Sequence, residues 1–167
     1  MTFIETEIEG CYVFYYDKKI DSRGDFSRIL CCNDLSFLDI NFVVKQSSIA
    51  TNRKKDTARG LHYQKDPHGE NKIITCVSGV IDVFILDLRK EPGERHTIIE
   101  RLDSRLSSTE LLYVPKYCAS GYITLEDNSA VLYYMDEYYH EESQKTIGFN
   151  IDCKVMSEKD SRARGKK

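Results

Sequence analysis

The sequence predicts an all-β domain, a sandwich or barrel in which helices are minor. Short runs rich in β-branched and aromatic residues recur at nearly regular spacing, and turn-forming residues separate them. Strands do not alternate with long helical segments, as they would in a βαβ unit. The chain has 167 residues, of which 41% are hydrophobic and 31% charged, which suits one globular domain. With no internal repeat or linker, we expect a single domain over residues 1–167.

The expected strands follow one another along the chain. The run Val80 to Leu88 is too apolar for an edge strand that faces water. Ile73 to Val77 precedes it, and the two residues between these runs, Ser78 and Gly79, predict a hairpin. Turn-forming residues from Glu126 to Ser129 separate the last two candidates. The other expected strands are Phe42 to Lys45, Thr97 to Glu100, Leu111 to Val114, Gly121 to Leu125 and Val131 to Met135.

Two short helices complete the expected domain. Asn33 to Leu38 predicts one, with Asn33 or Asp34 as its N-terminal cap. Ser157 to Asp160 predicts the start of the other. Beyond about residue 160 the sequence becomes basic and contains a glycine, so we expect a flexible tail there.

Composition and charge exclude several classes of partner. A formal net charge of -3 argues against a dedicated nucleic-acid binder, which normally carries a basic face. No apolar run approaches the roughly 18 residues that span a membrane, and the first residues lack the pattern of a signal peptide. The six cysteines include no C-x-x-C pair, the usual zinc spacing. We expect a cytoplasmic protein with free thiols and neither a nucleic-acid nor a membrane partner.

His62 is the most conspicuous of the four histidines, because Lys72 follows it at a short distance. If residues 60–64 form a strand, alternation puts His62 and Gln64 on the same face. An imidazole that points into a sandwich cavity beside a lysine can take a proton from carbon, and the lysine can stabilise the enolate that results. The alternative is a structural histidine packed in the core, and spacing alone does not separate the two.

A tyrosine-rich stretch covers residues 131–140. Alternation puts Tyr133 and Tyr134 on opposite faces of a strand, so only one of them faces a cavity. A phenol in that position can act as a general acid where the substrate excludes water. The alternative is amphipathic packing of these tyrosines at a surface or a dimer interface.

A metal-dependent jelly roll is the rival interpretation of such a site. Its ligands are usually two histidines one residue apart, a carboxylate and a histidine from a later strand. Here Gln64 stands two residues after His62, and Ser120 stands on the later strand. One histidine with a glutamine and a serine is a poor ligand set for a transition metal, so we expect no metal.

Taken together, these motifs resemble the dTDP-4-dehydrorhamnose 3,5-epimerase family. The central match is Arg59-Gly60-Leu61-His62-Tyr63-Gln64, followed by Lys72 and by Val77 to Arg89. Upstream, Asp21 to Phe26 and Lys45 to Ser48 are similar to that family's first two substrate-binding turns. Downstream, the match continues with Tyr113-Val114-Pro115, Ala119-Ser120-Gly121-Tyr122, Val131-Leu132-Tyr133, Glu137-Tyr138 and Ser157-Glu158-Lys159-Asp160. The likeness covers roughly residues 10–160.

The resemblance implies a cupin-type jelly roll that needs no cofactor and acts on a nucleotide-linked 4-keto-6-deoxy sugar, with dTDP as the expected nucleotide. It makes His62 the base that removes a proton beside the keto group, and Lys72 the cation that stabilises the enolate oxygen. Tyr133 returns a proton from the opposite face. Substrate binding falls to Arg23, Phe26, Gln46, Arg59, Ser120 and Tyr138, of which Arg23, Gln46 and Arg59 match positions that hold the diphosphate.

A homodimer is the quaternary structure that the resemblance implies. Residues 1–15 form a longer segment than the core of one sandwich of this size needs. We therefore expect this segment to add a strand to the sheet of a second copy.

Three positions depart from the family pattern. Ser120 stands where the family usually has histidine, and Arg28 where it commonly has glutamate. The third departure concerns the aspartate that orients the catalytic histidine, which in the family follows an aromatic-Asn pair. Here Ile151 follows that pair and Asp152 comes one place late, so a bulge is needed to turn Asp152 inward.

Two aspartates are therefore candidates for the partner of His62. Asp152 is the expected one, because it is nearest to the family's position. Asp82 is the alternative, since it lies on an otherwise apolar strand and must find a partner there.

Three functions compete on this basis. The leading one is epimerisation at C3, C5 or both carbons of the keto sugar. The second is a mono-epimerase or a 3,4-ketoisomerase with an altered substrate, which Ser120 favours. The third is a sugar-nucleotide binding protein with weakened catalysis, against which the joint presence of His62, Lys72 and Tyr133 argues.

Overall fold

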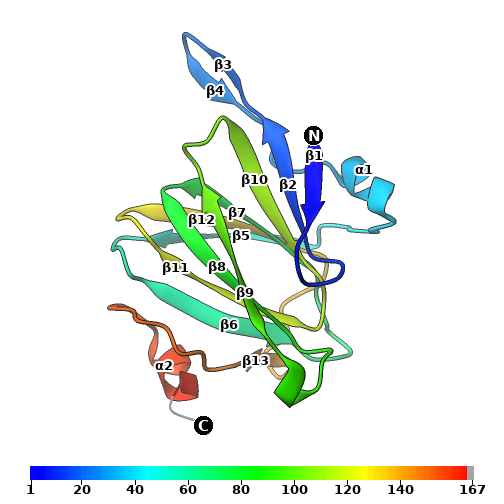
Figure 1. Cartoon of the computed structure of the whole chain (residues 1–167), viewed down its shortest axis with the longest axis vertical. Helices are drawn as coiled ribbons and strands as arrows, with labels where there is room; N and C mark the ends of the chain where they lie inside the picture. Colours follow the sequence, from blue (N-terminus) through cyan, green and yellow to red (C-terminus); the bar gives the residue numbers. More distant parts are fainter. Residues whose placement is uncertain (165–167) are drawn as a thin grey trace.

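Two antiparallel sheets pack face to face around an apolar core (Figure 1). The computed structural model describes residues 1–164. The strands are β1 (Thr2–Glu5), β2 (Tyr12–Asp17), β3 (Lys19–Asp21), β4 (Gly24–Phe26), β5 (Gln46–Asn52), β6 (Ala58–Gln64), β7 (Lys72–Ser78), β8 (Val80–Asp87), β9 (Thr97–Asp103), β10 (Ser108–Val114), β11 (Cys118–Thr124), β12 (Ser129–Met135) and β13 (Gln144–Thr146). The larger sheet has the order β1-β2-β10-β7-β12-β5 and the smaller sheet the order β13-β6-β11-β8-β9. The predicted all-β sandwich is confirmed.

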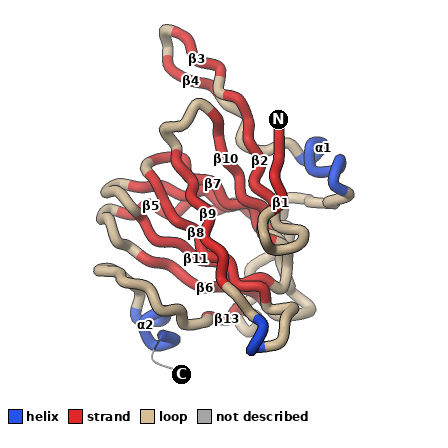
Figure 2. Tube along the Cα trace, viewed as in Figure 1, coloured by secondary structure: helices blue, strands red, loops and turns tan. Residues whose placement is uncertain are grey.

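Helices are short and lie at the edges of the sandwich (Figure 2). Helix α1 (Cys32–Leu35) and a 3₁₀ turn (Ser36–Leu38) form the predicted first helix. Its cap differs from the prediction, because Cys31 holds the cap position without a side-chain hydrogen bond. Asp34 instead accepts a hydrogen bond from the Tyr16 hydroxyl at 2.9 Å. Within residues 1–164 no helix is long and apolar enough to cross a membrane.

Helix α2 (Glu158–Arg164) stands where a flexible tail was expected. The Ser157 hydroxyl oxygen accepts the backbone N–H of Asp160 at 3.2 Å, which satisfies one of the free donors at the start of the helix. Asp160 is itself buried against the body of the protein. The expected tail is therefore ordered through Arg164, and its last residues, 165–167, lie outside the described residues.

Ser78 and Gly79 join strands of different sheets, so the predicted hairpin is wrong. β7 pairs with β10 and β12, whereas β8 pairs with β9 and β11. Gly79 has a φ of 79°, and a Cβ there would lie 2.5 Å from the Ser129 hydroxyl oxygen. A connection between two packed sheets requires glycine at this position, and so does a hairpin turn. The local sequence pattern therefore does not distinguish the two structures.

One other expected strand is absent. Residues 42–45 form no strand, and β5 begins only at Gln46. Phe42 is buried, but Val43 and Val44 are both exposed, so the apolar run does not have a consistently buried face. The remaining predicted strands are found in β9, β10, β11 and β12.

The core lies in two places. Between the sheets it includes Val13, Ile74, Val83 and Val131. A second cluster covers the outer face of the larger sheet, where Leu35 and other side chains of the segment 29–42 pack on β2, β7 and β10.

The N-terminal segment belongs to the core of its own chain, which differs from the expectation. Ile8 and Cys11 are fully buried between the sheets, and β1 pairs with β2 of the same chain. The prediction that residues 1–15 are not needed for this core is therefore wrong. The hairpin β3–β4 projects beyond the sandwich (Figure 1).

Candidate active site

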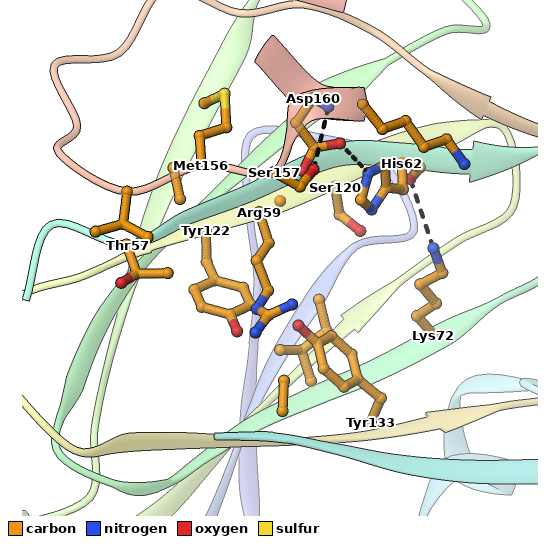
Figure 3. A pocket seen from close by; sticks show the side chains of 16 residues that line it. Thr57, Arg59, His62, Lys72, Ser120, Tyr122, Tyr133, Met156, Ser157 and Asp160 are labelled. Atoms are coloured by element: carbon orange, nitrogen blue, oxygen red, sulfur yellow. Dashed lines mark hydrogen bonds and ion pairs between the residues drawn. The ribbon is translucent and has the colours of Figure 1, made fainter. Parts of the chain in front are cut away.

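A cavity of about 540 Å³ opens between the two sheets. Strands β6 and β11 of the smaller sheet contribute one wall, β7 and β12 of the larger sheet the other, and the segment 155–160 lines its edge (Figure 3). Five of the residues assigned to the site from the sequence line this cavity: Arg59, His62, Lys72, Ser120 and Tyr133.

A β-bulge in β6 turns both Arg59 and His62 into the cavity. His62 pairs with Ser120 and Arg59 with Tyr122, so two residues of β6 lie opposite Gly121 alone. Side chains three residues apart point to opposite faces of a regular strand, and the extra residue cancels that reversal. Gly60 has a φ of 107°, and a Cβ there would lie 2.7 Å from the Gly121 Cα. The Arg-Gly-Leu-His motif therefore forms this bulge, with the glycine at the position that has a positive φ.

His62 is held by Asp160. The distance from His62 Nε2 to Asp160 Oδ1 is 2.7 Å, and the other carboxylate oxygen accepts the backbone N–H of Gly60 at 3.2 Å. Burial raises the pKa of Asp160, but the hydrogen bond and charge of His62, with the N–H of Gly60 and the Ser157 hydroxyl, outweigh it and hold that pKa below its usual value. An ionised carboxylate therefore fixes one ring nitrogen of His62 and leaves Nδ1 to accept a proton from a substrate.

The sequence-based choice of partner for His62 was wrong. Asp152 is exposed, in a segment that is not a strand, so the argument from strand alternation does not apply to it. Asp82 pairs with Arg101 at 2.8 Å, outside the cavity. Ser157-x-x-Asp160 was identified as the start of a helix, because a serine followed three residues later by an acid marks one, but Asp160 was not identified as the partner of His62. The docking of this helix on β6 is a long-range contact that the motif does not encode.

Lys72 lies at the start of β7, on the wall opposite β6, and its side chain reaches toward the strand that carries His62. Its Nζ is 2.9 Å from Glu70 Oε1. The same Nζ is 3.5 Å from the backbone carbonyl of His62, a contact drawn in Figure 3. The Glu70 side chain is 8% exposed, so the pair is nearly buried, and a buried ammonium needs such a counter-ion. Sequence reasoning did not identify Glu70.

Tyr133 faces the cavity from β12, on the wall opposite His62 (Figure 3). Burial raises its pKa well above the usual range, and the neighbouring Tyr122 adds to that rise. Tyr133 is thus a protonated phenol at neutral pH and can give a proton. Its neighbour Tyr134 packs in the cluster on the outer face of the same sheet, as alternation predicts.

Arg59 reaches into the cavity from β6 with its guanidinium fixed by a buried amide. Its Nε donates to the Asn52 side-chain oxygen at 3.0 Å, and the Tyr122 hydroxyl donates to the same oxygen at 3.2 Å. Asn52 is 2% exposed. Neither Asn52 nor Tyr122 was identified from the sequence as part of the site.

The other assigned residues lie away from the cavity. Arg23 and Phe26 belong to the projecting hairpin, where Arg23 pairs with Asp21 at 2.6 Å and Phe26 is 72% exposed. Gln46 begins the edge strand β5. Tyr138 is 62% exposed and lies after β12. None of these four side chains lines the cavity within the part of the chain that the structure describes.

The expected absence of a metal stays a prediction. Gln64, expected on the same face as His62, donates to the backbone carbonyls of His68 and Tyr138 instead of lining the cavity. Among residues 1–164, no three histidine, cysteine, aspartate or glutamate side chains are grouped closely enough to hold a metal ion.

The arrangement suits removal of a proton from one face of a carbon and delivery of a proton to the other. The base is supported by a carboxylate, an ammonium lies beside it, and a phenol stands on the opposite wall. These are the groups that inversion through an enolate requires, because the acid and the base must act on opposite sides of the same carbon.

Comparison with known proteins points to the same chemistry. The family model described as dTDP-4-dehydrorhamnose 3,5-epimerase matches residues 5–166. The dTDP-4-dehydrorhamnose 3,5-epimerase of Mycobacterium tuberculosis is 29% identical over 147 residues, which cover 86% of this chain and 70% of that protein. The Escherichia coli K12 protein of the same name is 27% identical over 158 residues, 90% of this chain and 80% of its own.

Solved structures extend the comparison to the fold. The crystal structure of the Bacillus anthracis dTDP-4-dehydrorhamnose 3,5-epimerase, with TDP and PPi bound, aligns with a TM-score of 0.87 at 28% identity and covers 95% of each chain. The sandwich is therefore the cupin-type jelly roll that the resemblance implied.

Proposed function

The chain belongs to the dTDP-4-dehydrorhamnose 3,5-epimerase family, whose members are isomerases, and we propose that its substrate is a dTDP-linked 4-keto-6-deoxy sugar. The observation that carries the proposal is the pair His62–Asp160 facing Tyr133 across one cavity. A binding protein without catalysis has no need of a carboxylate-supported imidazole opposite a protonated phenol.

In the proposed reaction the 4-keto group acidifies the protons on C3 and C5. His62 removes one of them, and the charge of Asp160 stabilises the imidazolium that forms. Lys72 stabilises the oxygen of the enolate, which gains negative charge as the C–H bond breaks. Tyr133 then donates its proton to the same carbon from the opposite face, and the configuration is inverted.

Substrate binding is proposed for residues around this centre. Arg59 holds the diphosphate, since a guanidinium can donate two parallel hydrogen bonds to phosphate oxygens. Ser120 lies opposite His62 and can hydrogen-bond a sugar hydroxyl. Gln46 pairs with Met135, which on its other side pairs with Lys72, so Gln46 lies at the same end of the sheet as the proposed enolate.

Tyr138 is the remaining binding residue on the body of the sandwich. It follows β12 closely, and the Lys45 Nζ lies 5.5 Å from the centre of its ring. An exposed ring at this end of the sheet can cover a substrate that fills the cavity.

The second candidate function is a mono-epimerase or a 3,4-ketoisomerase, and Ser120 favours it. This side chain is 6% exposed and stands beside His62, where the family usually has a histidine. A serine can hydrogen-bond a hydroxyl but cannot transfer protons at neutral pH. The loss of a proton-transferring histidine at this position should therefore impair epimerisation at one of the two carbons.

Incubation with dTDP-4-keto-6-deoxyglucose in D₂O tests the proposed function. We expect solvent deuterium at C5 and C3 of an inverted product, read by NMR, because the Tyr133 hydroxyl that delivers the new proton carries deuterium after exchange with D₂O. Deuterium at one carbon alone supports the mono-epimerase, and a 3-keto product supports the ketoisomerase. A wild-type protein that binds the substrate but incorporates no deuterium contradicts all three catalytic functions.

The projecting hairpin supports a homodimer. Arg23 and Phe26 do not line the cavity of their own chain, so they can contact a substrate only in the cavity of another subunit. Ile20 and Phe26 are 71% and 72% exposed on this hairpin, and neighbouring exposed apolar side chains mark a protein–protein contact surface. In the proposed dimer, the hairpin β3–β4 of one subunit reaches the cavity of the other.

Light scattering and dTDP titration test this dimer. We expect twice the chain mass at micromolar concentration and a dTDP dissociation constant about 10-fold higher in Arg23→Ala, because a hydrogen bond to a charged phosphate is lost. Arg95→Ala, which removes an exposed arginine outside the cavity, is the matched control and should bind dTDP normally. A monomer, or equal affinities for the two variants, contradicts the proposal.

A further inference from the structure

A polar cluster stands behind the proposed acid, and the reaction as described above uses only its arginine, to bind the diphosphate. We define it as Asn52, Arg59 and Tyr122. Asn52 and Tyr122 are 2% and 1% exposed, and the single side-chain oxygen of Asn52 accepts both Arg59 Nε and the Tyr122 hydroxyl. The Asn52 amide donates in turn to the carbonyls of Ala50 and Ser129, which fixes the orientation of its oxygen. The cluster is thus anchored to the backbones of β5 and β12.

Tyr122 and Arg59 are directed at Tyr133. Figure 3 shows the Tyr122 hydroxyl, the Arg59 guanidinium and the Tyr133 hydroxyl pointing toward one another inside the cavity. The rings of Tyr122 and Tyr133 have their centres 6.4 Å apart. The positive charge of Arg59 acts to lower the pKa of both phenols, although burial dominates each.

A buried acid needs such neighbours once it has reacted. When Tyr133 gives up its proton, its oxygen becomes a phenolate, and an isolated charge buried between two sheets is costly. In the unreacted state the Tyr122 proton points to Asn52, which is only an acceptor at that oxygen. A hydroxyl can rotate about its C–O bond, so the same proton can serve a new anion without any movement of the ring.

We propose that Tyr122 assists Tyr133 by turning its hydroxyl hydrogen bond from Asn52 to the Tyr133 oxygen as that oxygen loses its proton, a role that rests on the proposed function. In this step the O–H bond of Tyr133 breaks, and its proton forms the new C–H bond with the electron pair of the enolate. Tyr133 keeps the electron pair of its former O–H bond, and Tyr122 keeps its own proton. Solvent reprotonates Tyr133 after product release. Asn52 is a positioning residue that aims both Tyr122 and Arg59.

The ratio of inversion to deuterium wash-in tests this role. Wash-in with retained configuration needs substrate binding and His62 but no proton from Tyr133, whereas inversion needs all three. In Tyr122→Phe we expect inversion to fall by about 10- to 100-fold, the usual effect of removing a hydrogen bond to a charged group, while wash-in stays within about 3-fold of the wild type. A purely structural loss would lower both signals together.

Tyr134→Phe is the matched control for Tyr122→Phe. It makes the same substitution at the residue next to Tyr133 in β12, whose side chain lies on the opposite face of the sheet. It should leave both signals unchanged, and thermal melting should find all variants folded. Asn52→Ala is a second test of the role of Tyr122, because it removes the oxygen that accepts the Tyr122 hydrogen bond. It should lower inversion more than wash-in, and equal loss of both signals in each cluster variant overturns the proposal.

The outcomes separate this inference from the proposed function. If the wild type neither inverts nor exchanges the keto sugar, the proposed function fails and the inference fails with it. If the wild type reacts and Tyr133→Phe loses inversion selectively, but Tyr122→Phe behaves like the wild type, the inference alone is wrong.

Discussion

His62→Asn should lower both turnover and deuterium wash-in by about 10²–10⁴-fold, the usual contribution of a positioned general base. Asparagine keeps a polar side chain of similar reach but cannot take a proton from carbon at neutral pH. Both signals depend on proton abstraction, so they should fall together, unlike the selective loss expected when the acid is changed. NMR in D₂O measures the two signals on one sample.

The nucleotide provides the internal control for this variant. Arg59 and the other proposed nucleotide ligands are untouched, so calorimetry should find dTDP bound with nearly wild-type affinity. His96→Asn is the matched substitution, because His96 is exposed and distant in sequence from the cavity lining. A His62→Asn enzyme within 10-fold of wild-type turnover would show that another group is the base.

Much of the site could be predicted from strand alternation together with the family resemblance. Alternation placed Tyr133 and Tyr134 on opposite faces, and the family resemblance selected Tyr133 and His62 as the residues of the cavity. The structure puts these two on opposite walls. Arg59 is different, because alternation alone would turn it away from the side of His62. Only the bulge at Gly60 brings both side chains to one face, and a bulge is set by how β6 meets β11 rather than by β6 alone.

The failures have a common physical cause. Ser78-Gly79 gives the same local signal for a hairpin and for a crossing between sheets, and the choice depends on the partners of β7 and β8. Asp160 is 98 residues from His62 in sequence, on a helix whose start is locally encoded but whose docking is not. Local patterns predict elements well, and they do not specify which elements meet.

Glu70 and Asn52 were missed for a related reason. Each is a polar side chain whose importance comes from being buried beside a charged group, Lys72 in one case and Arg59 in the other. A buried polar group needs a partner, but the sequence does not show which polar groups are buried.

Asp160→Asn should lower turnover by about 10²–10⁴-fold while the protein still folds, because the variant removes the charge that orients His62 and stabilises its imidazolium. The asparagine oxygen can still accept the N–H of Gly60, so the contact between α2 and β6 survives. Asp152→Asn is the matched control, since Asp152 is exposed and should tolerate the change with near-normal turnover. Loss of activity in Asp152→Asn with retention in Asp160→Asn would reverse the assignment.

The same carboxylate should leave a signature in the pH dependence of stability. Its folded-state pKa lies below the ordinary aspartate value of about 3.9, because the hydrogen bonds and charge around it outweigh burial. The ionised form therefore stabilises the folded protein above that ordinary value, and the contribution is lost as pH falls from there through the lowered pKa. Thermal melting from pH 7 to pH 3 should therefore show a larger fall in melting temperature for the wild type and Asp152→Asn than for Asp160→Asn. Parallel melting curves for all three proteins would mean that Asp160 is not held as an anion beside His62.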